Sequence, residues 1–338
     1  MAASGKRMMP EGLGMKRVLT AFCFCAIILI PVLLQGCSKP VELNSMEKRN
    51  IALIAKMNSG YHWGAIKQGA DTAAREFNIN IDFNAPDDEE DVEGQIKLVN
   101  QAIDKKVDAL ILAASDYNAL VKVTERAFDL HIPVVIIDSE VNTKKINSYI
   151  ATDNYNAGKK AGNALADLVG KSCNVAIMNF VKGSKNAEQR EEGLLSFISQ
   201  YPGIKVTEKA YCSSDTNLAY QLTRKIISEH PEVNAIVAFN AISSEGVAEA
   251  VDQAGLSGRI KIVSFDSTPK EIDYMEKEVI QATITQNPFS MGYLGVKYAV
   301  DLLNKKNVPV YTDTGSKIIT RENMYLPENQ KLLFPIVK

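Results

Sequence analysis

The sequence predicts an α/β protein built from two lobes, each a doubly wound parallel sheet, joined by a hinge of three segments. Short apolar strands alternate with segments of helical periodicity along most of the 338 residues, and this alternation is typical of parallel sheets with right-handed crossovers. The pattern also occurs twice: IALIAKMNSGYHWGAIKQGA and NVAIMNFVKGSKNAEQREEGLLSF each run strand, polar loop, helix, with Gly69 and Gly193 in comparable places. The length and a hydrophobic content of 46% suffice for two domains with buried cores.

The first half of the chain contains the clearest strand. Residues 134–137 form an unbroken β-branched run, as expected for a strand that is buried on both faces of a sheet. The first helix is indicated by apolar residues between Ile66 and Phe77 that share one helical face. We expect strands at 51–57, 79–83, 109–113, 134–137 and 148–152, with helices at 63–77, 92–105 and 119–130.

The second half repeats the alternation after Asp153 and Asn154, two residues of types that commonly cap helices. We expect a helix at 154–168, strands at 175–178, 204–210, 235–239 and 260–265 with helices between them, an extended segment at 282–286, a helix at 289–304 and a short strand at 316–320. We expect the chain to return to the first lobe for the helix at 289–304 and to cross back to the second lobe for the strand at 316–320. The predicted lobes are 49–152 with 287–313, and 153–286 with 314–338.

A secretory signal is predicted at the start of the sequence. Lys16 and Arg17 precede an uncharged apolar run that leads directly to LQGC, which ends at Cys37. The run resembles a bacterial lipobox, which implies cleavage before Cys37 and lipidation of that cysteine. We therefore expect a signal peptide with a lipobox at 1–37 and a polar tether at 38–48. The alternative is an uncleaved transmembrane anchor, because the run is near the lower limit for spanning a bilayer.

Charge and cysteine content limit the possible partners. Loss of residues 1–37 moves the formal net charge from −2 to about −5, because that segment carries four basic residues and one acidic residue. A negative balance argues against a nucleic-acid partner. Beyond that segment only Cys173 and Cys212 remain, one before a predicted strand and one after the next. They would lie at opposite ends of neighbouring parallel strands, too far apart for a disulfide, so we expect two free thiols without a function.

Polar and aromatic residues follow nearly every long predicted strand at its carboxyl end. In chain order they are Asn58 to Trp63, Ser115 and Asp116, Asp138, Asn179 to Lys185, Asn240, Asp266, and Gln286 with Asn287. The carboxyl ends of parallel strands form one edge of a sheet, and two such edges facing each other would enclose a cleft between the lobes. Carboxylates, amides, an arginine and aromatic rings suit a neutral polyhydroxylated ligand, because polar groups bond its hydroxyls while ring faces cover its C–H surfaces.

Seven segments resemble one known family along nearly all of the predicted mature chain. They are IALIAKM with an aromatic pair soon after, HIPVVIIDS, SYIATDNYNAGKKAG, AEQREEGLLSF, AIVAFNAISSEGVAEAV, IVSFDSTP and ATITQNPFSMGYLGV. Their order and spacing are similar to those of the type I periplasmic solute-binding proteins of bacterial sugar uptake, the ribose- and galactose-binding group. The resemblance implies two Rossmann-like lobes. It also implies a ligand-binding role for His62, Trp63, Asp138, Arg190, Asn240, Asp266 and Gln286.

Three positions depart from the ribose-binding pattern. Ser139 stands where that pattern has an arginine, and Ala241 follows Asn240 where an aspartate is usual. Ser214 replaces a stacking aromatic residue of the second lobe. The resemblance therefore implies a small sugar or sugar-like polyol, accepted with a hydroxyl geometry that differs from that of ribose. A non-sugar hydroxylated or nucleoside-like ligand is the alternative.

The family resemblance also implies how the protein works. It implies a monomer that is lipid-anchored outside the cytoplasmic membrane, needs no cofactor or metal, closes about its hinge on a sugar and delivers it to an ABC importer. The alternative is a lipoprotein that presents its ligand to a membrane sensor kinase. The related repressors with this fold carry a DNA-binding headpiece, and here a signal and lipobox take its place.

An enzyme is not expected, because the sequence has no Cys-x-x-Cys, no glycine-rich phosphate loop and no Gly-x-Ser-x-Gly. The remaining enzymatic hypothesis is that Asp138 and Asp266 form a catalytic carboxylate pair.

Several of these residues also have a purely structural interpretation. Asp138 and Asp266 could only cap helices or loops. Arg190 could be a solvated partner of a neighbouring glutamate, and Trp63 could belong to the core, although its predicted place in the first strand-to-helix loop favours a ligand contact. The acidic run at 87–93, DDEEDVE, is expected to be a solvated loop and helix N-terminus.

Overall fold

The computed structural model describes residues 1–2, 5 and 48–334. The chain divides into two compact units, Met1–Lys48 and Arg49–Lys338, and every described helix and strand belongs to the second. Cys37 and nearly all of the predicted signal peptide and tether lie outside the described residues. Within the described part of the chain, no helix is long and apolar enough to cross a membrane.

Two six-stranded sheets have the same strand order and form the centres of two lobes. In spatial order, the first sheet contains β11 (Tyr311–Asp313), β5 (Ser148–Ala151), β4 (Val134–Ile137), β3 (Ala109–Leu112), β1 (Asn50–Ile54) and β2 (Asn80–Asn84). The second contains β12 (Lys317–Thr320), β10 (Ala282–Thr285), β9 (Lys261–Phe265), β8 (Ala235–Ala238), β6 (Ser172–Asn179) and β7 (Gly203–Tyr211). All neighbouring strands are parallel except β12, which is antiparallel to β10.

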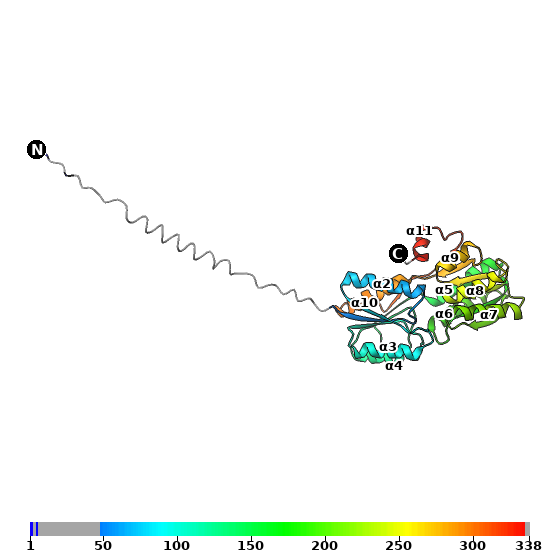
Figure 1. Ribbon diagram of the computed structural model, residues 1–338, viewed down its shortest axis with the longest axis horizontal. Coiled ribbons are helices and arrows are strands. Elements are labelled where there is room, and N and C mark those ends of the chain that lie inside the picture. Colours follow the sequence, from blue (N-terminus) through cyan, green and yellow to red (C-terminus); the bar gives the residue numbers. More distant parts are fainter. Residues whose placement is uncertain (3–4, 6–47, 335–338) are drawn as a thin grey trace. The chain divides into compact units, whose positions relative to one another are not determined.

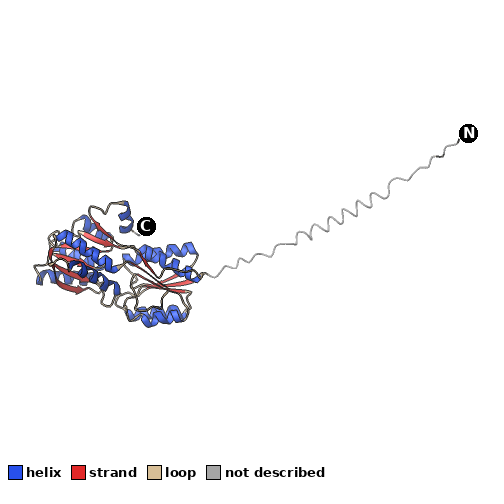
Figure 2. Cartoon of the chain, turned by 180° about the vertical axis from the view of Figure 1, so that it is seen from behind, coloured by secondary structure: helices blue, strands red, loops and turns tan. Residues whose placement is uncertain are grey.

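Helices cover both faces of each sheet (Figures 1 and 2). On the first sheet these are α2 (Tyr61–Phe77) with α10 (Pro288–Leu303), and α3 (Val92–Asp104) with α4 (Val121–Asp129). On the second they are α5 (Asn154–Val169) with α6 (Lys185–Ile198), and α7 (Thr216–Glu229) with α8 (Ala241–Gln253) and α9 (Pro269–Glu276). The last helix is α11 (Pro327–Leu333). The prediction of an α/β fold with two parallel-sheet lobes is confirmed.

The chain passes between the two sheets three times. It leaves the first sheet after β5, returns after β10 to form α10 and β11, and crosses again between β11 and β12. The helix α10 packs against α2 of the first lobe, although 200 residues and more separate them in sequence. These crossings place the carboxyl ends of both sheets against each other.

Buried strands with two covered faces explain why the sequence patterns predict the fold well. β3 and β4 are fully buried along their length. In β1, Ile51 and Leu53 belong to the core beneath α2 and α10, whereas Ala52 and Ile54 belong to the core beneath α3 and α4. Alternate side chains of one strand therefore fill two cores, which requires a continuous apolar run.

Paired helices approach each other closely at equivalent glycines. A Cβ atom on Gly69 of α2 would lie 2.0 Å from the carbonyl oxygen of Phe289, and one on Gly193 of α6 would lie 2.0 Å from the carbonyl oxygen of Tyr155. Only glycine permits this backbone contact. The two glycines thus occupy comparable places in the two lobes, as the repeated sequence pattern predicts.

The structure differs from the sequence prediction at several boundaries. Helix α2 begins at Tyr61, so His62 and Trp63 lie in its first turn and not in the preceding loop. β6 begins at Ser172, so Cys173 lies inside a strand. The short edge strand β11 was not predicted, because its three residues, two exposed and one half-buried, carry no recognisable apolar pattern. Both described cysteines are free, as expected, and both are buried.

Candidate functional site

Asp138 and Asp266 hold equivalent positions at the carboxyl ends of β4 and β9. Both have a left-handed backbone, with φ of 59° and 75°. Each donates its backbone N–H over 3.0 Å to an isoleucine carbonyl at the end of the next strand, Ile150 for Asp138 and Ile284 for Asp266. Aspartate is one of the few residues other than glycine that tolerate this conformation. The two lobes therefore present one carboxylate each from the same structural position.

His62 joins these two carboxylates. Its Nε2 lies 3.1 Å from Asp138 Oδ1, and its Nδ1 lies 3.9 Å from Asp266 Oδ1. Trp63 packs edge-on against His62 with ring centroids 5.1 Å apart, and it is 7% exposed. Trp63 belongs both to the core of the first lobe and to the lining of the candidate site, so the two interpretations of this residue are compatible.

Arg190 is held inside the second lobe and does not pair with a neighbouring glutamate. Its Nε donates to Asn154 Oδ1 at 2.9 Å and its Nη1 donates to the carbonyl oxygen of Phe239 at 2.6 Å. The guanidinium group also stacks over the ring of Phe265, 4.8 Å from its centroid. The side chain is 2% exposed, and the solvated-pair interpretation is therefore wrong.

Asn240 and Asp266 combine a structural role with a place in the site. Asn240 caps α8, accepting from the backbone N–H of Ser243 at 2.8 Å. Asp266 Oδ2 accepts from the backbone N–H of Ala241 at 2.9 Å, and its Oδ1 accepts from Gln286 Nε2 at 2.6 Å. The capping interpretation is thus partly correct for Asp266. It does not describe Asp138, whose carboxylate meets side chains only.

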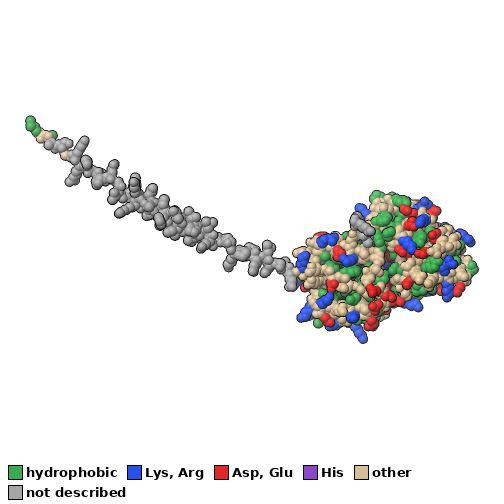
Figure 3. All heavy atoms as spheres, viewed as in Figure 1, with side chains coloured by type: hydrophobic (Ala, Val, Ile, Leu, Met, Phe, Trp, Pro, Cys, Tyr) green, Lys and Arg blue, Asp and Glu red, His purple; other side chains and the backbone are tan. Residues whose placement is uncertain are grey.

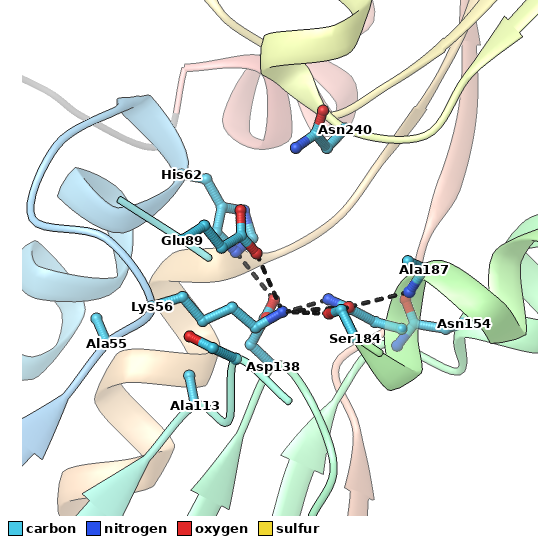
Figure 4. A network of polar contacts seen from close by, with 12 residues as sticks. Ala55, Lys56, His62, Glu89, Ala113, Asp138, Asn154, Ser184, Ala187 and Asn240 are labelled. Atoms are coloured by element: carbon cyan, nitrogen blue, oxygen red, sulfur yellow. Dashed lines mark hydrogen bonds and ion pairs between the residues drawn. The ribbon is translucent and has the colours of Figure 1, made fainter. Parts of the chain in front are cut away.

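Lys56 is a buried charge at the site that the sequence analysis missed. Its side chain is fully buried, and its Nζ lies 2.7 Å from Ser184 Oγ, 3.2 Å from Asn186 Oδ1 and 3.8 Å from Asp138 Oδ2. Figure 4 shows this ammonium group between residues of both lobes. The available signal was a lysine that directly follows the apolar run IALIA, two positions after the end of β1.

Glu89 is a second residue of the site that the sequence analysis did not identify, and its burial contradicts the expected exposure of the acidic run. The acidic run at 87–93 was expected to be solvated, and Asp87, Asp88 and Glu90 are indeed exposed. Glu89 is only 5% exposed, because its Oε1 pairs with Lys56 Nζ at 3.2 Å and its Oε2 accepts from Ser214 Oγ at 2.5 Å. No local pattern distinguishes this glutamate from its neighbours in the sequence.

All seven residues expected at the ligand-binding site line one cavity between the lobes. The cavity has an empty volume of about 460 Å³, including its open mouth. Its lining consists of Met57, Gly60, Tyr61, His62, Trp63, Glu89, Asp138, Phe180, Asn186, Arg190, Asn240, Ala241, Ile242, Asp266 and Gln286. Of the three departures from the ribose-binding pattern, Ala241 lines the cavity, Ser214 lies behind Glu89 and Asn240, and Ser139 is buried.

The charges in this cavity stabilise each other. Burial disfavours protonation of His62, but its hydrogen bond to Asp138 and the charges of Asp138 and Asp266 outweigh burial and raise its pKa. Burial disfavours ionisation of Asp138, yet the hydrogen bond and charge of His62, with Lys56 and Arg190, lower its pKa to about 2. The contact therefore favours the protonated imidazole of His62 and the ionised carboxylate of Asp138. Among the described residues, no group of three or more His, Cys, Asp or Glu side chains could hold a metal ion.

Comparisons with known proteins agree with this architecture. The family described as periplasmic binding protein domain matches residues 51–307. A D-ribose/D-allose-binding protein of Pseudomonas aeruginosa is 28% identical over 289 residues, which are 82% of this chain and 90% of that protein.

Two solved structures are also similar. A carbohydrate transporter solute-binding protein from Agrobacterium radiobacter, in complex with D-arabinose, is 27% identical with a TM-score of 0.83, covering 85% of this chain and 99% of that one. A sugar transporter from Clostridium phytofermentans is 34% identical with a TM-score of 0.76, covering 81% of this chain and 100% of that one.

The chain belongs to the periplasmic binding protein family, because the family match covers most of its length. The predicted family resemblance is thereby confirmed. The relatives are binding proteins, which also supports the expectation that this chain is not an enzyme.

Proposed function

We propose that the protein captures a small sugar or sugar-like polyol in the cavity between its lobes and delivers it to an ABC importer. The observation that carries this proposal is the pair Asp138 and Asp266, which face one cavity from opposite lobes with His62 between them. The named ligands of relatives, D-ribose or D-allose and D-arabinose, support the same class of molecule.

The chemistry of the lining favours a neutral polyhydroxylated ligand of pentose to hexose size. Asp138 and Asp266 accept from hydroxyls, and Arg190 donates to them. Trp63 and Phe180 supply apolar ring surface for C–H groups. An apolar ligand would leave these buried polar groups unpaired, at a cost of roughly 1 to 3 kcal/mol each.

Charge balance supports a ligand without a net charge. Lys56 and Arg190, with His62 whose pKa is raised by Asp138 and Asp266, lie against the carboxylates of Glu89, Asp138 and Asp266. A charged ligand would upset this balance inside a largely buried site.

Closure of the lobes is the mechanism we propose for capture. The moving bodies are 49–152 with 287–313, and 153–286 with 314–338, joined by the three chain crossings. Hydrogen bonds between side chains of the two lobes, such as Asn186 Nδ2 to Asp138 Oδ2 at 3.2 Å, exist only when the lobes meet. A ligand that contacts both lobes favours the closed state by its differential affinity.

The proposed setting is the outer face of the cytoplasmic membrane, with the monomer anchored through lipidated Cys37. The support for this part is the sequence, in which a basic pair and an apolar run lead to LQGC. The names of relatives favour an importer over a sensor kinase as the membrane partner. Acidic and basic side chains are both spread over the face drawn in Figure 3.

A thermal-shift screen over monosaccharides, polyols, nucleosides and amino acids tests the ligand class, because a ligand that binds the folded state raises the melting temperature. We expect stabilisation by an aldose or polyol. Stabilisation by nucleosides or amino acids alone would exclude a sugar ligand. Membrane fractionation of Cys37→Ser tests the anchor separately, and fractionation with membranes like the parent protein would favour an uncleaved helix.

A further inference from the structure

The loop between β2 and α3 places one carboxylate inside the cavity. Asp88 and Glu90 of this loop are exposed, whereas Glu89 between them is 5% exposed and lines the cavity. Asp91 is the N-cap of the next helix, α3, and its side chain accepts from the backbone N–H of Gly94 at 2.8 Å. Glu89 is therefore the one acidic residue of this run that is buried and lines the cavity, whereas its acidic neighbours face solvent.

Two partners fix the position of the Glu89 carboxylate. Lys56 Nζ lies 3.2 Å from Oε1, and Ser214 Oγ donates to Oε2 at 2.5 Å. Lys56 is fully buried, so this ion pair is shielded from solvent and loses little to screening by salt. Figure 4 shows Glu89 beside Lys56, with His62 and Asn240 nearby.

The contact with Ser214 connects the two lobes. Glu89 belongs to the first lobe, whereas Ser214 follows β7 of the second. Asn240 Nδ2 donates to the same Ser214 Oγ at 3.2 Å, and Asn240 also lines the cavity. A continuous polar chain therefore runs from Lys56 through Glu89 and Ser214 to Asn240, and it is complete only when the lobes are together.

Glu89 retains capacity to accept further hydrogen bonds. An ionised carboxylate has about four acceptor positions, and each oxygen of Glu89 has one side-chain partner. Because the group lines the cavity, its remaining capacity faces the space available to a ligand. A ligand hydroxyl is a donor of the kind that fits this position, because an ionised carboxylate oxygen that already has one partner can accept a second hydrogen bond.

We propose that Glu89 is a specificity-determining ligand contact, which accepts a hydrogen bond from one hydroxyl of the bound sugar and which Lys56 and Ser214 position as the lobes close. This inference rests on the proposed function. Glu89 acts as a third carboxylate beside Asp138 and Asp266, and it selects sugars with a hydroxyl directed toward the β2–α3 loop. A sugar without that hydroxyl leaves a buried acceptor unpaired and is discriminated against.

The test uses isothermal titration calorimetry with the sugar that the thermal-shift screen identifies and with its monodeoxy analogues. Glu89→Gln keeps the shape of the side chain but replaces one acceptor oxygen by a donor NH₂ group. We expect this variant to bind the sugar about 10- to 100-fold more weakly. For the one analogue that lacks the contacted hydroxyl, parent and variant should have similar affinities.

Substitutions at the sequence neighbours of Glu89 and Ser214 serve as matched controls. Glu90→Gln removes a charge from the exposed neighbour in the same loop, and Ser213→Ala is the control for Ser214→Ala. We expect both controls to stay within about twofold of the parent protein. Ser214→Ala should weaken binding, because it releases Glu89 Oε2 from the second lobe.

Sugar binding by the parent protein tests the proposed function alone, and the comparison of variants tests Glu89 alone. Parent-like affinity of Glu89→Gln for the sugar, or an equal loss of affinity for every deoxy analogue, would overturn the proposal. Urea unfolding establishes that the variant is folded. Glu89→Asp gives a second test that keeps the buried charge, and it should change the ranking of the analogues because its carboxylate is set back by one methylene.

Discussion

The imidazole of His62 and the carboxylate of Asp138 form the hydrogen bond that links the first turn of α2 to the end of β4, with Nε2 and Oδ1 3.1 Å apart. Both groups belong to the first lobe and both line the cavity. Because the pKa of His62 is raised and the pKa of Asp138 is lowered to about 2, this pair makes the stability of the protein depend on pH.

Stability should fall as pH rises through the raised pKa of His62. The folded protein holds this pKa above the ordinary value of 6.5, so the stabilisation is complete below that value and is lost at higher pH. Urea unfolding of the parent protein and His62→Gln at about pH 5.5 and about pH 8.5 measures the effect. The difference in unfolding free energy between the two proteins should be larger at the lower pH. An equal difference at both pH values would show that His62 is not charged in the folded state.

The contribution of Asp138 to stability should have the opposite pH dependence from that of His62, because it is lost as pH falls. Its pKa is lowered from 3.8 to about 2, so its contribution is complete above the ordinary value and is lost as pH falls toward 2. The shift corresponds to about 2 kcal/mol. Asp138→Asn should therefore be less stable than the parent protein near pH 5 by an amount of this order, and the gap should narrow in acid. The exposed Asp167→Asn serves as the control, with little change expected at any pH.

Removal of the buried cation at Lys56 should destabilise the protein strongly. Lys56→Met keeps much of the side-chain volume but leaves the buried carboxylates of Glu89 and Asp138 without their shared partner. Loss of one member of a buried ion pair costs about 3 to 5 kcal/mol. Urea unfolding should show a loss of this order.

The double variant Lys56→Met with Glu89→Gln should recover part of that stability, because the uncompensated charge is then removed. Lys67→Met replaces an exposed lysine of α2 and should change stability little. If the double variant were no more stable than Lys56→Met, packing and not charge would account for the role of Lys56.

The sequence predicted the sheet lobes and the strand-end residues well, because a strand with two covered faces must be apolar until the chain leaves the sheet. Asp138 and Asp266 end such runs, and their positions follow from that rule alone. Lys56 and Glu89 could not be found in this way. Each depends on a partner far along the chain, 33 residues from Lys56 to Glu89 and 125 from Glu89 to Ser214, and periodicity does not report such pairs.

Helix beginnings were a second source of error. Gly60 occupies the N-cap position directly before YHWG, and it offers no side-chain oxygen of the kind by which Ser, Thr, Asp or Asn mark a helix start. His62 was therefore left in the preceding loop, and Trp63 was placed at the boundary of the predicted helix. Their place in the first helical turn fixes them more rigidly than a loop would, and it also lets the Trp63 ring join the core.

A suitable replacement of Asp266 should reduce sugar affinity while the stability of the fold is retained. Its Oδ2 accepts from the backbone N–H of Ala241 and its Oδ1 from Gln286, so an alanine would leave both donors unpaired and would also be strained at a φ of 75°. Asp266→Asn keeps an oxygen for the backbone N–H and tolerates the left-handed conformation, so the fold should be retained.

The variant nevertheless loses the negative charge that strengthens hydrogen bonds from sugar hydroxyls. We expect affinity for the sugar to fall roughly 10- to 100-fold by calorimetry while the urea midpoint changes little. Parent-like affinity would mean that Asp266 serves only to cap α8 and to hold Gln286.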